Sequence, residues 1–220
     1  MNYEKRIEWD ALPHTDQVGH GREGLVLRLD EKRCIKIYSP ERMRRAEKEF
    51  ENYGTLRKAG FLVPQEHEFV EVHIGGKPVE LPGKDEFTGI GLYTFNDIDS
   101  VPGIVKEFFP GMPYGRKKPT IKEIKGLITY LRELDAAGLT FEDGISLDFI
   151  ASTKGTALVD CSTLMHRSQY RKGNFISFEY WSSAYQRRIL SDFRHELHHN
   201  GFLTAGFDFR FMMANWLSKK

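Results

Sequence analysis

The chain has 220 residues and a mass of 25.5 kDa, which fits one domain or two small lobes and excludes a larger assembly of domains. Lys and Arg number 32 against 31 Asp and Glu, so the formal net charge of +1 gives no overall basic field of the kind that nucleic-acid-binding proteins use. Apolar residues make up 40% of the chain, which excludes a disordered or fibrous protein. We therefore expect a globular protein with a sizeable core and no nucleic-acid partner.

The cysteine content and the start of the chain indicate a compartment. Cys34 and Cys161 are too few for a disulfide framework, which favours a reducing environment. The first ten residues carry several charges and contain no apolar signal segment, and no later run approaches the 18 apolar residues of a membrane span. The sequence thus predicts a cytoplasmic protein without a transmembrane segment, and leaves open delivery into a host cell as an effector.

Three short β-like stretches follow the polar start, and one helix comes after them. The second and third stretches alternate apolar with polar or basic residues, and the sequence Asp30-Glu31-Lys32 supplies a turn between them. The helix begins near Pro40, carries apolar residues at three- and four-residue spacing, and ends at Gly60. The three predicted strands cover residues 15–19, 25–29 and 33–38.

Three further strands complete this half of the chain. They are predicted over residues 61–74, 89–95 and 103–109, and the last stops at the sequence Pro110-Gly111. A turn at residues 75–78 and a polar loop containing Pro82 and Gly83 separate the first two of these strands.

Beyond residue 111 the pattern becomes helical. Thr120 is a plausible N-cap with Glu123 three residues later, and the apolar face of the helix continues to Gly138. Two short apolar runs and an aromatic-rich helix from Phe178 onward follow. The runs cover residues 145–151 and 156–159.

The lobe boundary is predicted at residues 111–119. The sequence therefore predicts an α+β fold with two lobes: a strand-rich lobe with one helix over residues 1–110 and a mainly helical lobe over residues 111–220.

A glycine motif lies between the first two predicted strands. Residues 19–26 read Gly-His-Gly-Arg-Glu-Gly-Leu-Val, which places Gly19, Gly21 and Gly24 in the spacing Gly-x-Gly-x-x-Gly. A dinucleotide-binding fingerprint needs a helix after the third glycine, whereas here a strand follows. The alternative is a hairpin whose backbone N–H groups approach nucleotide phosphates, although an ordinary flexible hairpin has the same composition.

Lys36 stands inside an otherwise apolar strand, where a buried ammonium group is costly unless it is paired. The helix that follows carries Glu47, Glu49 and Glu51. Glu49 is the one expected to point inward, because it shares a helix face with Ala46, Tyr53 and Leu56. The alternative is an edge-strand lysine whose ammonium group reaches solvent.

These motifs and their order resemble the protein-kinase-like superfamily, in its compact bacterial form, from residue 19 to about residue 160. The resemblance implies that Gly19, Gly21, Gly24 and Val26 cover the phosphates of ATP, and that Lys36 paired with Glu49 anchors them. Residues 104–111 resemble the strand and hinge that join kinase lobes. The hinge residues that would bind adenine through their backbone are Glu107, Phe108 and Phe109.

The helical half adds the residues that phosphoryl transfer needs. Residues 131–148 are similar to the kinase helix and catalytic loop, in which an aspartate precedes a metal-binding asparagine by five positions, and Asp143 and Asp148 have that separation. Residues 157–162 read Ala-Leu-Val-Asp-Cys-Ser, so a short strand delivers Asp160 into a turn as in the kinase Asp-Phe-Gly motif. The resemblance implies Asp143 as the base and Asp148 with Asp160 as Mg²⁺ ligands.

Several positions depart from the kinase pattern. Phe141-Glu142 replace the usual His-Arg, Asp148 replaces Asn, and Cys161-Ser162 replace Phe-Gly. No Ala-Pro-Glu follows, and without the arginine there is no expected partner for a phosphorylated activation loop. Regulation by such phosphorylation is therefore not expected.

The predicted function is an ATP- and Mg²⁺-dependent kinase that transfers the γ-phosphoryl group to a hydroxyl, with Ser/Thr of a protein as the favoured acceptor. A small-molecule kinase acting on a sugar or a lipid-linked sugar is the alternative enzyme. From another class, a pseudokinase would bind nucleotide or a partner without turnover. The presence of Lys36, Asp143 and Asp160 favours the active enzyme.

A competing motif occurs near the C-terminus. Residues 195–199 read His-Glu-Leu-His-His, which contains the His-Glu-x-x-His spacing of zinc hydrolases. No glutamate follows Glu196, and Asp208 is the one acidic residue downstream that could serve as a third ligand. A solvated helix face is therefore the favoured interpretation of this segment, with a zinc hydrolase as the remote alternative.

Overall fold

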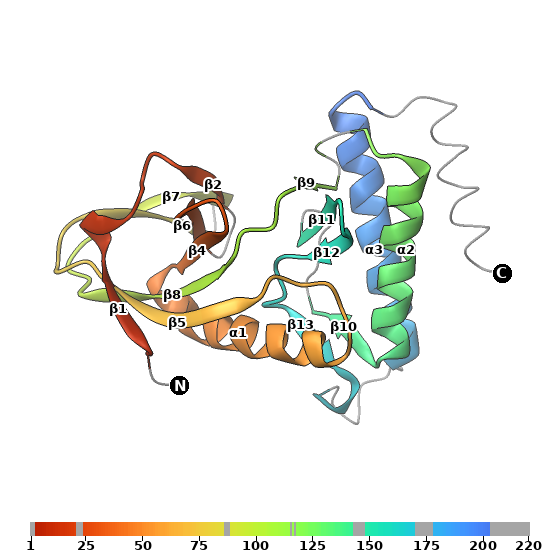
Figure 1. Ribbon diagram of the computed structural model, residues 1–220, viewed down its shortest axis with the longest axis horizontal. Helices are drawn as coiled ribbons and strands as arrows, with labels where there is room; N and C mark the ends of the chain where they lie inside the picture. Colours follow the sequence, from red (N-terminus) through yellow and green to blue (C-terminus); the bar gives the residue numbers. More distant parts are fainter. Residues whose placement is uncertain are drawn as a thin grey trace. The chain divides into compact units, whose positions relative to one another are not determined.

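The computed structural model describes residues 3–20, 24–85, 89–114, 116, 118–142, 148–169 and 178–202. The chain divides into two compact units (Figure 1). The first unit comprises residues 1–54 and 64–108, and the second comprises residues 55–63 and 109–220. The fold is α+β, as predicted, with a strand-rich first unit that contains one helix and a second unit whose described residues are mainly helical.

A six-stranded sheet forms the centre of the first unit, in the order β1-β5-β8-β4-β3-β2. Strands β1 and β5 run parallel, and every other neighbouring pair in this sheet is antiparallel. The sheet strands are β1 Lys5–Glu8, β2 Gln17–His20, β3 Gly24–Arg28, β4 Arg33–Tyr38, β5 Glu66–His73 and β8 Ser100–Glu107, with a 3₁₀ turn at Trp9–Ala11 after β1.

In the central strand β4, every residue after Arg33 is buried. Because successive side chains point to opposite sides of the sheet, this strand is covered on both faces. On one face, Tyr38 packs in a cluster with Ala46 of helix α1 (Met43–Lys58), and this helix runs along the sheet (Figure 1). On the other face, Ile35 and Ile37 belong to an apolar cluster that includes Val79. The first unit therefore has an apolar layer on each side of β4.

The second layer includes an additional two-stranded ribbon, β6 (Val79–Asp85) paired with β7 (Gly89–Phe95). The prediction of a polar loop containing Pro82 and Gly83 is wrong, because both residues lie in β6. A two-stranded ribbon leaves each strand one edge without a strand partner, where proline is tolerated. The alternate residues Val79 and Leu81 are buried in the core and hold the strand in place.

The second unit contains two long helices, α2 (Ile121–Ala136) and α3 (Phe178–His199), which lie side by side (Figure 1). Gln186 of α3 donates a hydrogen bond to the Leu131 carbonyl of α2 at 3.3 Å. Two small sheets complete the unit, one with the order β12-β11-β9 and one formed by β10 and β13. Their strands are β9 Met112–Pro113, β10 Leu139–Phe141, β11 Phe149–Ser152, β12 Gly155–Leu158 and β13 Leu164–His166.

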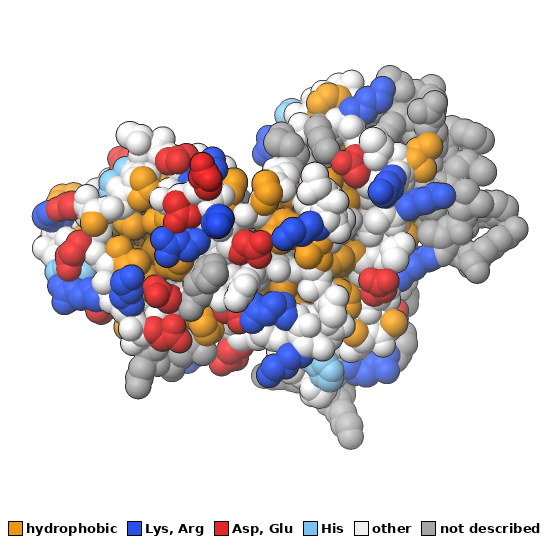
Figure 2. Space-filling view, viewed as in Figure 1, with side chains coloured by type: hydrophobic (Ala, Val, Ile, Leu, Met, Phe, Trp, Pro, Cys, Tyr) orange, Lys and Arg blue, Asp and Glu red, His pale blue; other side chains and the backbone are white. Residues whose placement is uncertain are grey.

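Charges are mixed on the surface. In the face that Figure 2 shows, acidic and basic side chains of the described residues are intermingled, in agreement with the near-zero net charge. No helix in the described part of the chain combines the length and the apolar character that crossing a membrane requires.

Helix α2 begins with the predicted cap. The Thr120 hydroxyl accepts the backbone N–H of Glu123 at 3.2 Å, and the Glu123 carboxylate accepts the backbone N–H of Thr120 at 2.7 Å. This reciprocal arrangement satisfies two backbone donors that the first helical turn leaves without intrahelical partners. The helix ends at Ala136, and Gly138, two residues later, has a φ of 72° in the left-handed region that glycine adopts readily.

We predict that Thr120→Ala lowers the free energy of unfolding by about 1 kcal/mol, because the cap hydroxyl is lost. Urea denaturation followed by tyrosine and tryptophan fluorescence measures this change. Lys122→Ala, an exposed substitution in the same helical turn, is the control and should unfold close to wild type. Equal stability of Thr120→Ala and Lys122→Ala would contradict a stabilising role for the cap.

Candidate functional site

The glycine motif lies in the hairpin between β2 and β3. These strands are antiparallel, with Gly19 opposite Val26, so the motif is followed by a strand as predicted. Gly21 lies outside the described residues. Packing alone favours a glycine at position 24, because a Cβ at this position would lie 2.1 Å from the Ile37 carbonyl oxygen of β4. The proposed contact of Gly19, Gly24 and Val26 with phosphates stays a prediction.

Two lysines project from the same face of the sheet. Lys36 of β4 is paired with Ile104 of β8, and Lys106 follows two residues later on β8. Because side chains two residues apart on a strand share a face, Lys36 and Lys106 are diagonal neighbours. Both are almost fully buried, with 4% of their surface exposed.

The carboxylate of Glu49 on α1 forms ion pairs with both lysines. The Lys36 ammonium lies 2.6 Å from Glu49 Oε2 and the Lys106 ammonium lies 2.8 Å from Glu49 Oε1. Two tyrosine hydroxyls complete the cluster: Tyr38 donates to Oε2 at 2.6 Å and Tyr53 donates to Oε1 at 2.7 Å. Each carboxylate oxygen therefore accepts one ammonium and one phenol group. We call these five residues the Glu49 cluster.

The electrostatics of the cluster keep Glu49 ionised. Complete burial favours the neutral acid and raises the pKa of Glu49, but the positive charges of Lys106 and Lys36 and their hydrogen bonds outweigh that effect. The net result is a pKa well below the usual range for a glutamate. At neutral pH the cluster thus contains a buried carboxylate with two ammonium groups beside it.

The predicted pairing of Lys36 with Glu49 is present in the structure. The helical phase that selected Glu49 is also confirmed, because Ala46, Glu49 and Tyr53 are all fully buried whereas Glu51 is exposed. Sequence reasoning missed Lys106, which carries the same signal as Lys36: a lysine within an apolar strand. The functional role of the pair stays a prediction.

The residues predicted as an adenine-binding hinge begin at Glu107, the last residue of β8. The backbone N–H of Phe108 donates to the Lys32 carbonyl at 2.7 Å, and the Glu107 N–H donates to the Gln65 carbonyl at 2.7 Å. Both amides are therefore engaged within the first unit, while the Glu107 carbonyl accepts the Cys34 thiol at 3.9 Å. The contact of Glu107, Phe108 and Phe109 with adenine stays a prediction, and it would use carbonyl groups or the amide of Phe109.

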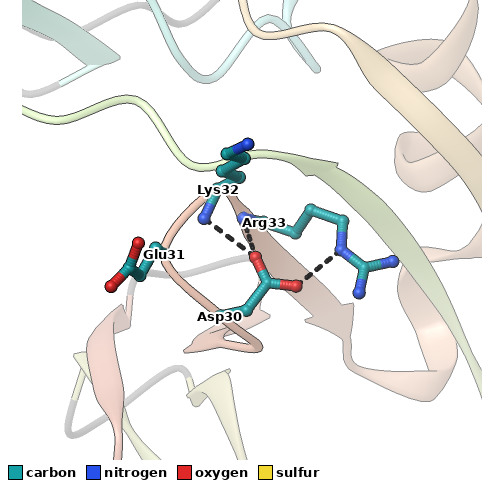
Figure 3. A pocket seen from close by; sticks show the side chains of 4 residues that line it. All are labelled: Asp30, Glu31, Lys32 and Arg33. Atoms are coloured by element: carbon teal, nitrogen blue, oxygen red, sulfur yellow. Dashed lines mark hydrogen bonds and ion pairs between the residues drawn. The ribbon is translucent and has the colours of Figure 1, made fainter.

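The turn between β3 and β4 is held by Asp30 (Figure 3). Its carboxylate accepts the backbone N–H groups of Lys32 and Arg33, both at 2.8 Å, and the Arg33 guanidinium at 2.7 Å. These hydrogen bonds lower the pKa of Asp30. Residues 30–33 also line a hollow of about 410 Å³. None of the residues predicted to bind nucleotide lines it, so we assign it no part in the site.

In the second unit, Asp148 and Asp160 stand at the open end of the β11–β12 hairpin. Asp148 immediately precedes β11, Asp160 follows β12 by two residues, and Phe149 is paired with Leu158. The Val159 N–H donates to the Asp148 carbonyl at 2.8 Å, which extends the pairing to the aspartates. Both side chains are partly exposed. The hairpin thus brings together the two predicted metal ligands.

A serine orients Asp160. The Ser162 hydroxyl donates to Asp160 Oδ1 at 3.0 Å, and the Ser162 N–H donates to the same oxygen at 3.2 Å. The adjacent Cys161 is fully buried, and its carbonyl accepts the Leu164 N–H at 3.1 Å, closing the turn. Asp160 is therefore held at a fixed turn immediately after β12.

Asp143, the predicted base, lies outside the described residues. The described residues on either side of it both bind the segment around Asp160. The Glu142 N–H donates to the Thr163 carbonyl at 2.8 Å, and Asp148 binds Val159 as described above. The role of Asp143 stays a prediction.

The His-Glu-x-x-His segment lies in the last turn and a half of α3. His195, His198 and His199 are exposed, and Leu197 is the buried member of the segment. The Glu196 carbonyl accepts the backbone and side-chain N–H groups of Asn200. Within the described ranges, no group of three or more His, Cys, Asp or Glu residues is arranged to hold a metal ion. Asp208, the suggested third ligand, lies outside those ranges.

Comparisons with known proteins give structural neighbours without a family assignment. Neither the protein-family models nor the curated proteins match this chain. Among solved structures, WbdD in complex with the kinase inhibitor LY294002 is 15% identical with a TM-score of 0.43, over 69% of this chain and 33% of WbdD. An Stt7 homologue from Micromonas algae, soaked with ATP, is 17% identical with a TM-score of 0.46, over 70% of this chain and 49% of the homologue. The chain therefore spans about a third and about half of the length of these two proteins.

We predict that Glu49→Gln lowers the free energy of unfolding by about 3 to 5 kcal/mol, because two buried ammonium groups lose their counter-charge. Urea denaturation at pH 7 measures the change. The matched control is Glu51→Gln on the same helix, where the side chain is exposed, and it should stay within about 0.5 kcal/mol of wild type. Equal stability of the two variants would show that the Glu49 cluster does not stabilise the first unit.

Proposed function

We propose that this protein is an ATP- and Mg²⁺-dependent phosphotransferase that transfers the γ-phosphoryl group to a hydroxyl. The observation that carries the proposal is the ion pair between Lys36 of β4 and Glu49 of α1, on the strand that follows the glycine hairpin. A strand lysine held by a helix glutamate is the arrangement that protein kinases use for the α- and β-phosphates of ATP. Here the pair is buried and positioned by two further hydroxyls.

The first unit supplies the nucleotide contacts in this proposal. The Lys36 ammonium binds phosphate oxygens, since a cation with three N–H donors can bind Glu49 and a second anionic group. Glu49 fixes where that ammonium lies. Backbone N–H groups of the glycine hairpin donate to the phosphates, and the backbone of residues 107–109 binds the adenine ring.

The second unit supplies the metal ligands and the base. Asp148 and Asp160 are hard oxygen ligands at the end of one hairpin, and protein sites for Mg²⁺ use one or two carboxylates with phosphate oxygens and water as the other ligands. The two aspartates therefore fit this ion. When bound, Mg²⁺ neutralises charge on the β- and γ-phosphates. In the proposal, a carboxylate oxygen of Asp143 accepts the proton of the attacking hydroxyl.

The proposed acceptor is a Ser or Thr hydroxyl of a protein. The test is incubation with ATP labelled at the γ-phosphate, Mg²⁺ and a whole-cell lysate, with Asp143→Ala as the matched control. Label in protein bands that depends on Asp143 supports the proposal. Label in small molecules or lipids alone identifies the small-molecule kinase instead, and nucleotide binding without any transfer identifies a pseudokinase.

We predict that Lys36→Ala weakens Mg·ATP binding by about tenfold or more, because a charge-assisted hydrogen bond to phosphate is lost. Thermal-shift titration measures this through the stabilisation that ligand binding gives the native state. Lys77→Ala removes an exposed lysine of the first unit and should bind like wild type. The absence of any shift in the wild-type protein with nucleotide and metal would refute the proposed function.

We predict that Asp160→Ala abolishes phosphoryl transfer whereas Asp148→Asn preserves much of it. Asp160 supplies a carboxylate at a fixed turn, while the amide introduced by Asp148→Asn would keep one oxygen ligand and lose a negative charge. Initial rates across Mg²⁺ concentrations should show a higher Mg²⁺ requirement for Asp148→Asn with a similar plateau. If Asp148→Asn is as inactive as Asp160→Ala at saturating Mg²⁺, Asp148 has a role beyond metal binding and the assignment of Asp143 as base is wrong.

A further inference from the structure

The proposed mechanism gives no role to Lys106, although its side chain is buried beside Glu49. Lys106 donates to Glu49 Oε1 at 2.8 Å and to the Tyr53 hydroxyl at 2.6 Å, and that hydroxyl donates in turn to Oε1 at 2.7 Å. Lys106, Tyr53 and Glu49 thus form a closed set of three hydrogen bonds. Its members come from β8 and from two successive turns of α1.

The two oxygens of Glu49 divide the cluster into matched halves. Oε1 accepts Lys106 and Tyr53, and Oε2 accepts Lys36 and Tyr38. Each ammonium also lies near the ring of the tyrosine in its own half, 4.9 Å from the ring centroid for Lys106 and 4.8 Å for Lys36. The half that contains Lys106 therefore binds the oxygen of the carboxylate that Lys36 does not bind.

This division matters when Lys36 contacts an anionic group. A buried carboxylate without a compensating cation is strongly destabilising. If Lys36 were the only cation beside Glu49, turning its charge toward a phosphate would leave the carboxylate poorly compensated. With Lys106 in place, Glu49 keeps a full positive charge at Oε1 while Lys36 engages the phosphate.

We infer that Lys106 is a positioning residue that holds Glu49 in place and compensates its charge, so that Lys36 can engage an anionic phosphate. The inference rests on the proposed function, since it concerns the lysine that would bind ATP. It adds a second lysine on a different strand to the phosphate-binding machinery. Lys106 acts through Glu49 and does not itself contact the nucleotide.

If Lys106 compensates the charge of Glu49, removing its charge changes the pH at which the fold loses stability, which a purely packing role would not do. Among the described residues, the groups that face Glu49 include Lys36 and Tyr38 of β4, Lys106 of β8 and Tyr53 of its own helix. Burial raises the pKa of the nearby Cys34 thiol of β4, and the charges of Lys106 and Glu49 act on the same thiol. In the folded protein the pKa of Glu49 is lowered, so its ionised form stabilises the fold above the usual glutamate pKa. That stability is lost as the pH falls through the folded pKa. Removing the charge of Lys106 raises the folded pKa and moves this loss to higher pH.

The experiment compares Lys106→Met with Lys106→Arg and with the exposed control Lys58→Met on helix α1. For each variant, Mg·ATP affinity at pH 7.5 and the melting temperature from pH 7 to pH 3 are measured. We expect Lys106→Met to bind Mg·ATP about tenfold more weakly, because Lys36 must then compensate Glu49 alone, and to lose thermal stability at a higher pH than wild type. Lys106→Arg should restore most of the affinity because it restores the charge, and Lys58→Met should behave as wild type in both measurements.

The outcomes separate this inference from the proposed function. Wild-type protein that binds no nucleotide refutes the proposed function and the inference together. Wild-type protein that binds Mg·ATP through Lys36, together with unchanged affinity in Lys106→Met, overturns the inference alone. The inference is also overturned if Lys106→Met binds Mg·ATP more weakly but loses thermal stability at the same pH as wild type, and if Lys106→Arg does not restore the affinity. In that case the substitution would affect only packing.

Tyr53→Phe provides a second test if Lys106→Met fails to fold. This substitution removes the hydroxyl that joins Lys106 to Glu49 and keeps both charges and the ring. We expect Mg·ATP affinity to fall by about two- to fivefold, less than in Lys106→Met. We also expect thermal stability to be lost at a higher pH than in wild type. The inference would be overturned if Tyr53→Phe bound Mg·ATP with wild-type affinity and lost thermal stability at the same pH as wild type.

Discussion

The burial of one carboxylate constrains the first unit more than any other interaction. Glu49 has no exposed surface, so its charge requires partners at both oxygens, and these come from β4, β8 and α1. The structure meets this requirement because Lys36 and Lys106 share a sheet face, which a one-residue shift of β4 against β8 would undo, and because α1 presents Glu49 and Tyr53 to that face. An apolar core of the same volume would tolerate small changes in helix rotation, whereas a buried ion cluster does not.

Local periodicity accounts for the parts of the fold that the sequence could predict. The alternation in β4 and the three- and four-residue spacing in α1 are each readable from one segment, and together they identified Lys36 and Glu49 as partners. Lys106 carries the same local signal as Lys36, a lysine within an apolar strand, but its meeting with Glu49 was not predicted because this contact depends on which strands are neighbours and in what register. Strand β8 joins β4 from about 70 residues away in sequence, and neither the pairing nor its register has a local signature.

The other missed elements are also non-local. Strand β1 is stabilised by parallel pairing with β5, more than 60 residues away, and its burial pattern is mostly exposed, so it lacks an apolar alternation. Strands β9, β10 and β13 have two or three residues each, which is too short for any periodicity to register. In the site, by contrast, Asp148 and Asp160 could be placed together from sequence because a single hairpin connects them.

The turn that holds Asp160 is built without a glycine at residues 161 and 162. Glycine is favoured where the backbone adopts a positive φ. Among the described residues the only non-glycine with a positive φ is Asp97, so Cys161 and Ser162 do not need the freedom of glycine. Ser162 instead contributes a hydroxyl and an N–H to one oxygen of Asp160, while the buried Cys161 anchors the turn in the core. Both hydrogen bonds converge on one oxygen and so direct the carboxylate, although solvent screening of the partly exposed Asp160 reduces what they contribute to stability. The Asp160-Cys161-Ser162 turn thus orients its aspartate through hydrogen bonds from Ser162 and does not depend on a glycine.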